Sequence, residues 1–353
     1  MHVLSVSSLK GGVGKTTVVL GLASAAFAAG LRTLVVDLDP QCDATTGLGA
    51  IGEFETNVAS VLKNPKHDVV SRAIVSSAWG KSAGGLVDVL PGSTRSVHYD
   101  TPHPTVRQTW ILEEALHRVE KDYDIVIIDT PPSINALTRT AWVASDRVLL
   151  VTEPGIFSVV AAERAQRALE EIREAVTKRV RLLGFVVNRH RPASKEQEFR
   201  LQELHDLFGD LILPKYLEEK SHLQQTQGAA RPIHTWPGEG AVEVAHFFTW
   251  LLTQVRESFD EVTEELRVEN KPVKRSVFRR MKRGKKGPEK VSIEQAFDML
   301  GESVTEVEES RVIPESSPST AEPEIIPEVS EPSTDTGGWN FKLEIERPNN
   351  QPE

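Results

Sequence analysis

The chain has 353 residues, 39% of them hydrophobic and 26% charged, with a formal net charge of −10. These values are typical of a soluble globular protein, and the length favours one large domain with an appendage. The one cysteine, Cys42, excludes an internal disulfide framework and any paired-cysteine metal or redox motif. We find no apolar run long enough to cross a membrane and no signal peptide, so we expect a cytoplasmic protein.

Short apolar runs alternate with longer helical patterns over the first part of the chain. Helices are predicted at 16–30 and 159–176, and a final helix near 241–257 is expected to close the domain. The predicted strands are continuously apolar, which indicates a parallel sheet that is buried on both faces. We therefore predict an α/β fold with a mostly parallel sheet and helices on both faces. The predicted strands are 2–8, 33–39, 86–90, 124–130, 147–153 and 181–188.

The first predicted strand leads into a glycine-rich loop, residues 8–17 with the sequence SLKGGVGKTT, which opens a helix. This is the context of a phosphate-binding loop, where backbone N–H groups and a helix N-terminus face an anion. We expect Lys15 to reach the β- and γ-phosphates of a nucleotide and Thr16 to bind Mg²⁺. The loop departs from the common G-x-x-x-x-G-K-S/T pattern, because Leu9 replaces the first glycine and Lys10 adds a second lysine. The other predicted nucleotide contacts are Gly11, Gly12, Val13, Gly14 and Thr17.

Two acidic motifs follow predicted strands, VVDLDPQ at 35–41 and YDIVIIDTPPS at 123–133. The carboxyl ends of parallel strands are where open α/β sheets bind ligands. Asp129, at the end of the second of these strands, is expected to hold Mg²⁺ through a water molecule. In the first motif Asp37 lies earlier on its strand than Asp39.

The combination of KGGVGKTT, DLDPQ and IIDTPPS resembles the ParA family of partition ATPases, within the larger group that includes MinD, over roughly residues 1–257. The resemblance implies a P-loop NTPase-like domain that uses ATP and Mg²⁺ and hydrolyses ATP weakly on its own. It implies that Lys10 crosses a dimer interface to the nucleotide of the other subunit, and that Asp39 positions the attacking water. It also implies that Asn188 contacts adenine and that Pro214 flanks the base. For Asn188, a turn residue at a strand end is the alternative.

The resemblance is incomplete. The family often has Gly-Asn after DPQ, whereas this chain has Cys42 and Asp43, and we interpret Cys42 as a tolerated small residue. The segment after Pro214, KYLEEKSHLQQ, lacks the usual arginine and asparagine, so we expect a different surface there. The iron–sulfur members of the superfamily need paired cysteines and are excluded by the single thiol.

The charges are strongly segregated along the chain. Residues 1–260 carry 27 Lys and Arg against 31 Asp and Glu, whereas 271–290 carry 10 against 1 and 291–353 carry 3 against 15. We predict an ATPase domain at 1–260, a basic linker or helix at 261–290, and a tail at 291–353. The tail is acidic and rich in Pro, Ser and Glu, so we expect it to be largely disordered apart from a short aromatic motif at its end.

The basic run at 271–290 is the strongest electrostatic signal for a nucleic-acid partner, since ten cations can neutralise several phosphates. Its apolar residues fall near helical spacing, so an anionic membrane is the alternative surface. A solvated linker, or one masked by the acidic tail, also stays open. Further candidate contacts to DNA in the folded domain are Arg189, Arg191, Lys195, Arg200, Lys215, Lys220 and Arg231.

The sequence therefore favours an ATP-driven switch that forms an ATP-dependent homodimer and binds nucleoid DNA without sequence preference. A ParB-like or other activating protein is expected to stimulate hydrolysis and release. The cargo is a chromosome, a plasmid or a protein assembly. The alternative is a MinD-like regulator that cycles on the membrane.

Overall fold

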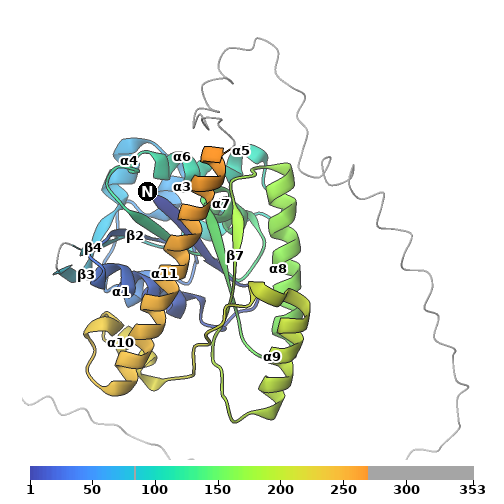
Figure 1. The fold of residues 1–353 in the computed structure, drawn as a ribbon. Coiled ribbons are helices and arrows are strands. Elements are labelled where there is room, and N and C mark those ends of the chain that lie inside the picture. The colour runs from blue at the N-terminus through green and yellow to red at the C-terminus, as the bar shows by residue number, and fades with distance from the viewer. Residues whose placement is uncertain (83–84, 269–353) are drawn as a thin grey trace, which may run out of the picture. The chain divides into compact units, whose positions relative to one another are not determined.

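A seven-stranded sheet organises the fold (Figure 1). The computed structural model describes residues 1–82 and 85–268. The strand order is β3-β4-β2-β5-β1-β6-β7, and every neighbouring pair is parallel except β3 and β4. The strands are β1 (His2–Ser7), β2 (Arg32–Asp37), β3 (Val75–Ser82), β4 (Gly85–Leu90), β5 (Ile125–Asp129), β6 (Arg147–Thr152) and β7 (Arg181–Val187). The predicted fold class and all six predicted strands are confirmed.

The helices include each predicted one, as α1, α8 and α11. The last of these continues to Val268, beyond both its expected end and the proposed domain boundary at residue 260. The predictions for 271–290 and for the tail at 291–353 lie outside the described residues. The helices are α1 (Lys15–Ala28), α2 (Asp43–Gly47), α3 (Val58–Lys63), α4 (His67–Ala73), α5 (Val106–Thr109), α6 (Ile111–His117), α7 (Ala136–Ala144), α8 (Ile156–Ala175), α9 (Lys195–Phe208), α10 (Ser221–Gly228) and α11 (Glu239–Val268), with 3₁₀ turns η1 (Thr94–Tyr99), η2 (Gly209–Leu211) and η3 (Ile233–Thr235).

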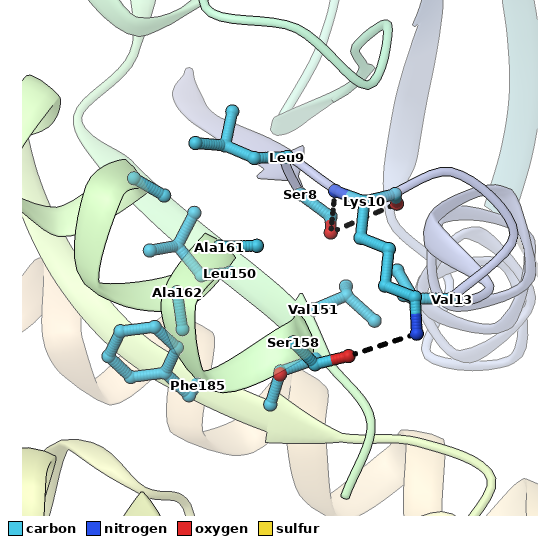
Figure 2. Close-up of a pocket in the computed structure, with 12 residues that line it drawn as sticks. Ser8, Leu9, Lys10, Val13, Leu150, Val151, Ser158, Ala161, Ala162 and Phe185 are labelled. Carbon is cyan, nitrogen blue, oxygen red and sulfur yellow. Dashed lines mark hydrogen bonds between the residues drawn. The ribbon is translucent and has the colours of Figure 1, made fainter. Parts of the chain in front are cut away.

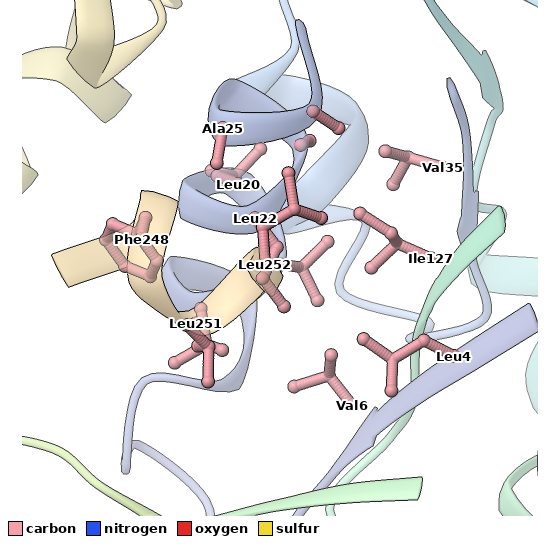
Figure 3. Packing of buried hydrophobic residues seen from close by; sticks show 14 of the residues in the cluster. Leu4, Val6, Leu20, Leu22, Ala25, Val35, Ile127, Phe248, Leu251 and Leu252 are labelled. Carbon is pink, nitrogen blue, oxygen red and sulfur yellow. The ribbon is translucent and has the colours of Figure 1, made fainter. Parts of the chain in front are cut away.

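Successive strand residues point to opposite faces of the sheet, and both faces are buried. Leu4 and Val6 of β1 join the core under α1 and α11, whereas Val3 joins the core under α3, α6 and α7. Val148 and Leu150 of β6 and Phe185 and Val187 of β7 pack under α7, α8 and α9 in a third cluster. Figure 3 shows how Phe248 and Leu252 of α11 meet α1 above the first core. This two-sided burial is the physical reason for continuously apolar strands.

The strand register gathers the motifs at one edge of the sheet. In β1, Val6 is level with Asp129 of β5, and Asp129 is in turn level with Asp37 of β2. The phosphate loop leaves β1 immediately after this level. The loop and both acidic motifs therefore meet at the carboxyl ends of three adjacent strands, as predicted from the sequence.

Candidate nucleotide-binding site

The glycine-rich loop has a backbone that requires glycine. Gly12 and Gly14 have φ values of 77° and 91°, in the left-handed region that other residues rarely adopt. A Cβ atom on Gly14 would lie 2.1 Å from the Nδ2 atom of Asn188, so a larger residue is excluded there by contact as well. Gly14 is the N-cap of α1 and has no side chain to cap the first N–H groups of that helix. These groups and the helix dipole favour an anion at the loop.

An open cavity of about 440 Å³ lies against the loop. Lys15 and Thr16, at the start of α1, border it together with Asp39, which follows β2. Lys15 is only 7% exposed, so its charge is partly shielded from water. The charge lies at the border of this cavity. The cavity is lined by Gly11, Gly12, Gly14, Lys15, Thr16, Thr17, Leu20, Asp39, Gln41, Asp43, Thr46, Gly47, Pro132, Arg189 and Gln227.

Asp129 is fully buried beside the first turn of α1. Its Oδ2 atom accepts a hydrogen bond of 2.7 Å from the Thr16 hydroxyl, while Oδ1 has no hydrogen-bond partner among the described residues. Burial, followed by the negative charge of Asp37, raises the pKa of Asp129 above the ordinary range of aspartate. A cation next to Thr16 and Asp129 would stabilise the ionised form of this buried carboxyl.

The donor set fits Mg²⁺. Magnesium prefers oxygen ligands and is usually held by one or two carboxylates together with substrate phosphates and water. Thr16 and Asp129 supply a hydroxyl and a carboxylate next to the loop. No group of three or more His, Cys, Asp or Glu side chains in residues 1–82 and 85–268 could hold a metal by itself. The site therefore suits a cation that arrives with a nucleotide.

The two acids of DLDPQ differ in position. Asp37 is fully buried, and its Oδ2 accepts hydrogen bonds from the N–H and hydroxyl of Thr45 at 2.8 and 2.6 Å. Asp39 borders the cavity, and its Oδ1 accepts a hydrogen bond of 3.0 Å from the N–H of Gln41. Burial raises the pKa of both carboxyls. Asp39 is thus the acid that faces the cavity, and Asp37 supports the chain that carries it.

Lys10 points away from this cavity. Its Nζ atom forms an ion pair with Glu153. The same atom donates a hydrogen bond of 3.3 Å to the Ser158 hydroxyl, as Figure 2 shows. Glu153 lies in the connection between β6 and α8, and Ser158 lies in the first turn of α8. The residues around the large cavity include Lys15 but not Lys10, among the residues that the structure describes. The two lysines of the loop therefore face different places.

Asn188 and Pro214 do not line the cavity. Asn188 is buried, and its Nδ2 atom donates a hydrogen bond of 2.7 Å to the carbonyl oxygen of Val13. Through this hydrogen bond, Asn188 holds the backbone of the phosphate loop in place. Pro214 is exposed and lies just beyond the buried Leu213. The contacts of Asn188 and Pro214 with a base stay predictions.

Several cavity residues were not predicted as nucleotide contacts, among them Arg189 and Gln227. Arg189 was considered only as a contact to DNA, and Gln227 of α10 was not considered at all. The Nε2 atom of Gln227 donates a hydrogen bond of 2.9 Å to the hydroxyl of Thr17. Arg189 adopts a left-handed φ of 54° next to Asn188. An isolated glutamine in α10 carries no motif that would reveal this contact.

Most candidate DNA contacts are occupied within the domain. Arg191 pairs with Glu219 at 2.6 Å, and Arg200 pairs with Glu196 and Glu203 at 2.8 Å each. Further partners are Glu218 and Glu243 for Lys220, the Trp250 ring for Lys215, and the Trp236 ring for Arg231. These cations are partly neutralised or stacked, so the domain surface offers a weaker electrostatic footprint than their number suggests.

Sequence comparison identifies the relatives of this chain. Residues 1–182 match a family described as an AAA domain. The chromosome-partitioning ATPase Soj of Thermus thermophilus is 32% identical over 188 residues, which cover 52% of this chain and 68% of Soj. The chromosome partitioning protein ParA of Caulobacter vibrioides is 28% identical over 239 residues, covering 66% of this chain and 86% of that protein. The chain belongs to the ParA family.

Solved structures share the fold of this ParA-family protein. An ATP complex of McdA from Cyanothece superposes with a TM-score of 0.62 at 19% identity, covering 72% of this chain and 96% of McdA. Cobyrinic acid a,c-diamide synthase from Mycobacterium smegmatis, with a bound ATP analogue and magnesium, gives a TM-score of 0.60 at 23% identity, covering 73% and 97%. At these identities the likeness establishes the fold alone.

The described helices of the ParA-family domain contain no candidate for a membrane span, because none is both long and apolar enough.

Proposed function

We propose that this ParA-family protein is an ATP-driven positioning switch that binds Mg²⁺ and ATP in the cavity beside the phosphate loop. The observation that carries the proposal is the meeting of Lys15, Thr16 and Asp39 around one cavity, with Asp129 bonded to Thr16. Related structures with ATP, or with an ATP analogue and magnesium, support this choice of ligand.

Each residue has a role that follows from its chemistry. The loop N–H groups and Lys15 neutralise charge on the β- and γ-phosphates, where preorganised donors stabilise phosphoryl transfer. Thr16 would bind Mg²⁺, and Asp129 would hold it through a water molecule. Asp39 orients the attacking water for in-line displacement. Bound Mg²⁺ would supply further positive charge to neutralise the phosphates.

ATP is proposed to join two copies of the chain. Lys10 of each subunit would reach the phosphates bound by its partner, so the nucleotide becomes part of the dimer interface. Two observations support this: Lys10 is turned away from its own cavity, and Lys15 already serves that cavity. A subunit alone then lacks one phosphate-binding cation, so we expect the monomer to hydrolyse ATP weakly. Stimulation of the dimer by a ParB-like or other activating protein is a separate part of the proposal.

The dimer is proposed to hold nucleoid DNA through the basic run at 271–290, without sequence preference. Segregated positive charge supports DNA as the surface. The amphipathic spacing within the run favours a membrane as the second candidate, which would make the protein a MinD-like regulator. The cargo class is a chromosome, a plasmid or a protein assembly.

Co-sedimentation with DNA tests this proposal. The full-length protein is mixed with DNA and with ATP, ADP or no nucleotide, at two salt concentrations, beside Lys10→Ala and a chain that ends at residue 268. We expect ATP-dependent binding that weakens steeply with salt and is lost in Lys10→Ala and in the shortened chain. Binding to anionic liposomes without DNA binding in any condition would establish the membrane alternative instead.

A further inference from the structure

The side chain of Lys10 is held within its own subunit. Glu153 provides an ionic partner and Ser158 a hydroxyl acceptor at 3.3 Å. Lys10 is 33% exposed and Glu153 22%, so water screens this pair less than a fully exposed one. Glu153 directly follows β6, and Ser158 lies in the first turn of α8, so both partners belong to the same stretch of the chain. Lys10 is therefore not a freely moving surface lysine.

A second cation lies near the other oxygen of Glu153. The Nη1 atom of Arg189 lies 3.9 Å from Oε2 of Glu153. Arg189 also borders the nucleotide cavity, and its left-handed backbone is unusual for a residue with a side chain. Backbone outliers of this kind persist where surrounding structure holds them and are frequent at functional sites. Glu153 thus lies between two cations, paired with Lys10 and near Arg189, which borders the nucleotide cavity.

Lys10 must leave Glu153 before it can reach a nucleotide in another subunit. The exchange replaces one carboxylate by phosphate oxygens, and a triphosphate offers more negative charge than a diphosphate. An ion pair that has to be broken makes the exchange harder for both nucleotides. The Lys10–Glu153 ion pair therefore matters most for ADP, which attracts Lys10 less strongly than ATP does. With ADP, little dimer is expected to form.

We propose that Glu153 is a positioning residue that retains Lys10 in its own subunit and opposes sandwich formation until ATP is bound. This inference rests on the proposed function, which gives Lys10 its destination in the partner. Loss of the Glu153 charge should free Lys10, strengthen self-association and lower the requirement for the γ-phosphate.

Chemical labelling tests the retention itself in the full-length protein without nucleotide. Acylation of lysine amines by an N-hydroxysuccinimide ester is followed by mass spectrometry, with the exposed Lys63 as internal reference. We expect Glu153→Gln to raise the labelling rate of Lys10 about threefold, the factor that one partly exposed ion pair contributes. Glu163→Gln, which removes an ion pair with Arg167 on α8, is the matched control and should leave Lys10 unchanged. Equal Lys10 labelling in wild type and Glu153→Gln overturns the inference.

Self-association tests the consequence. In an Asp39→Ala background that slows hydrolysis, Glu153→Gln should tighten the dimer with ATP about tenfold, because two such pairs are released per dimer. The gain should vanish when Lys10→Ala is added, since Glu153 acts through Lys10. A dimer that forms with ATP but ignores Glu153→Gln refutes this inference alone. Faster Lys10 labelling without any ATP-dependent dimer supports the retention and refutes the proposed function.

Discussion

Asp129 combines a functional position with a cost to stability. It is fully buried, it shares the site with Asp37, and burial is the main cause of its raised pKa. In the unfolded chain the same carboxyl titrates at the ordinary value, near pH 4. The folded state therefore binds this proton more tightly, and Asp129 costs stability as the pH rises through and above that value.

Asp129→Asn should stabilise the protein in the absence of Mg²⁺ and nucleotide, and by more at higher pH. Below about pH 4 the Asp129 carboxyl is protonated in the folded and in the unfolded chain, so the variant gains little. By pH 8 we expect a gain on the order of 3 kcal/mol in the free energy of unfolding. Urea denaturation at pH 5 and pH 8 measures the difference. The exposed Asp68→Asn is the control. A gain that is equal at both pH values, or a loss, would contradict this account of the site.

Cys42 should react slowly despite being a free thiol. Burial, with the charges of Asp37 and Asp39 next, raises its pKa to about 11. Since the thiolate is the nucleophile, we expect alkylation by iodoacetamide at pH 8 to be at least about tenfold slower than that of glutathione. Mass spectrometry of timed samples measures the rate. Alkylation as fast as glutathione would show that the acids do not suppress the thiolate, and would reopen a redox role.

At the scale of elements, α1 and α11 hold the phosphate loop on the sheet. Gly21 of α1 faces the ring of Phe248 of α11, and a Cβ on Gly21 would lie 2.2 Å from that ring. Phe248 is fully buried, so its ring has no free space to enter. The closeness of these two helices, and with it the position of the start of α1, depends on a glycine that has a helical backbone.

Gly21→Ala should therefore destabilise the protein, although alanine has the higher helix propensity. Overpacking costs about 1–3 kcal/mol and the propensity gain is about 1 kcal/mol, so we expect a net loss of up to about 2 kcal/mol. Thermal or urea denaturation measures it. Gly228→Ala, at the end of α10 with open space around it, is the control and should be neutral or stabilising. If adding Phe248→Leu failed to recover part of the loss, the contact would not be its cause.

The sequence predicted the features that leave a local signal, either a continuous apolar run or a short motif. Six strands were recognised because two-sided burial makes them continuously apolar. The edge strand β3, with serines and a single large apolar residue, Trp79, gave no such signal, because it is antiparallel and lies at the margin of the sheet. In the site, Lys15 and Thr16 follow from the loop motif. The Lys10–Glu153 contact joins residues 143 positions apart and could not be predicted from spacing.

At the scale of the whole molecule, the proposed switch depends on how Lys10 of one copy of the chain contacts the nucleotide of another. Lys15 faces the nucleotide cavity of its own subunit, whereas Lys10 is held at the connection between β6 and α8. Glu153 and Arg189 link these two places within a subunit. The proposed cycle then requires that ATP, but not ADP, moves Lys10 from this connection to the partner. Binding to DNA, to cargo and to an activating protein would all follow from that step.

The most direct test is the molecular mass in solution, measured by light scattering on the full-length Asp39→Ala protein with Mg²⁺ and ATP, ADP or no nucleotide. Lys10→Ala in the same background is measured alongside. We expect the mass to double with ATP alone, and the protein to stay monomeric in all conditions when Lys10 is replaced. A monomer with ATP, a dimer without nucleotide, or a dimer that persists in Lys10→Ala would contradict this expectation.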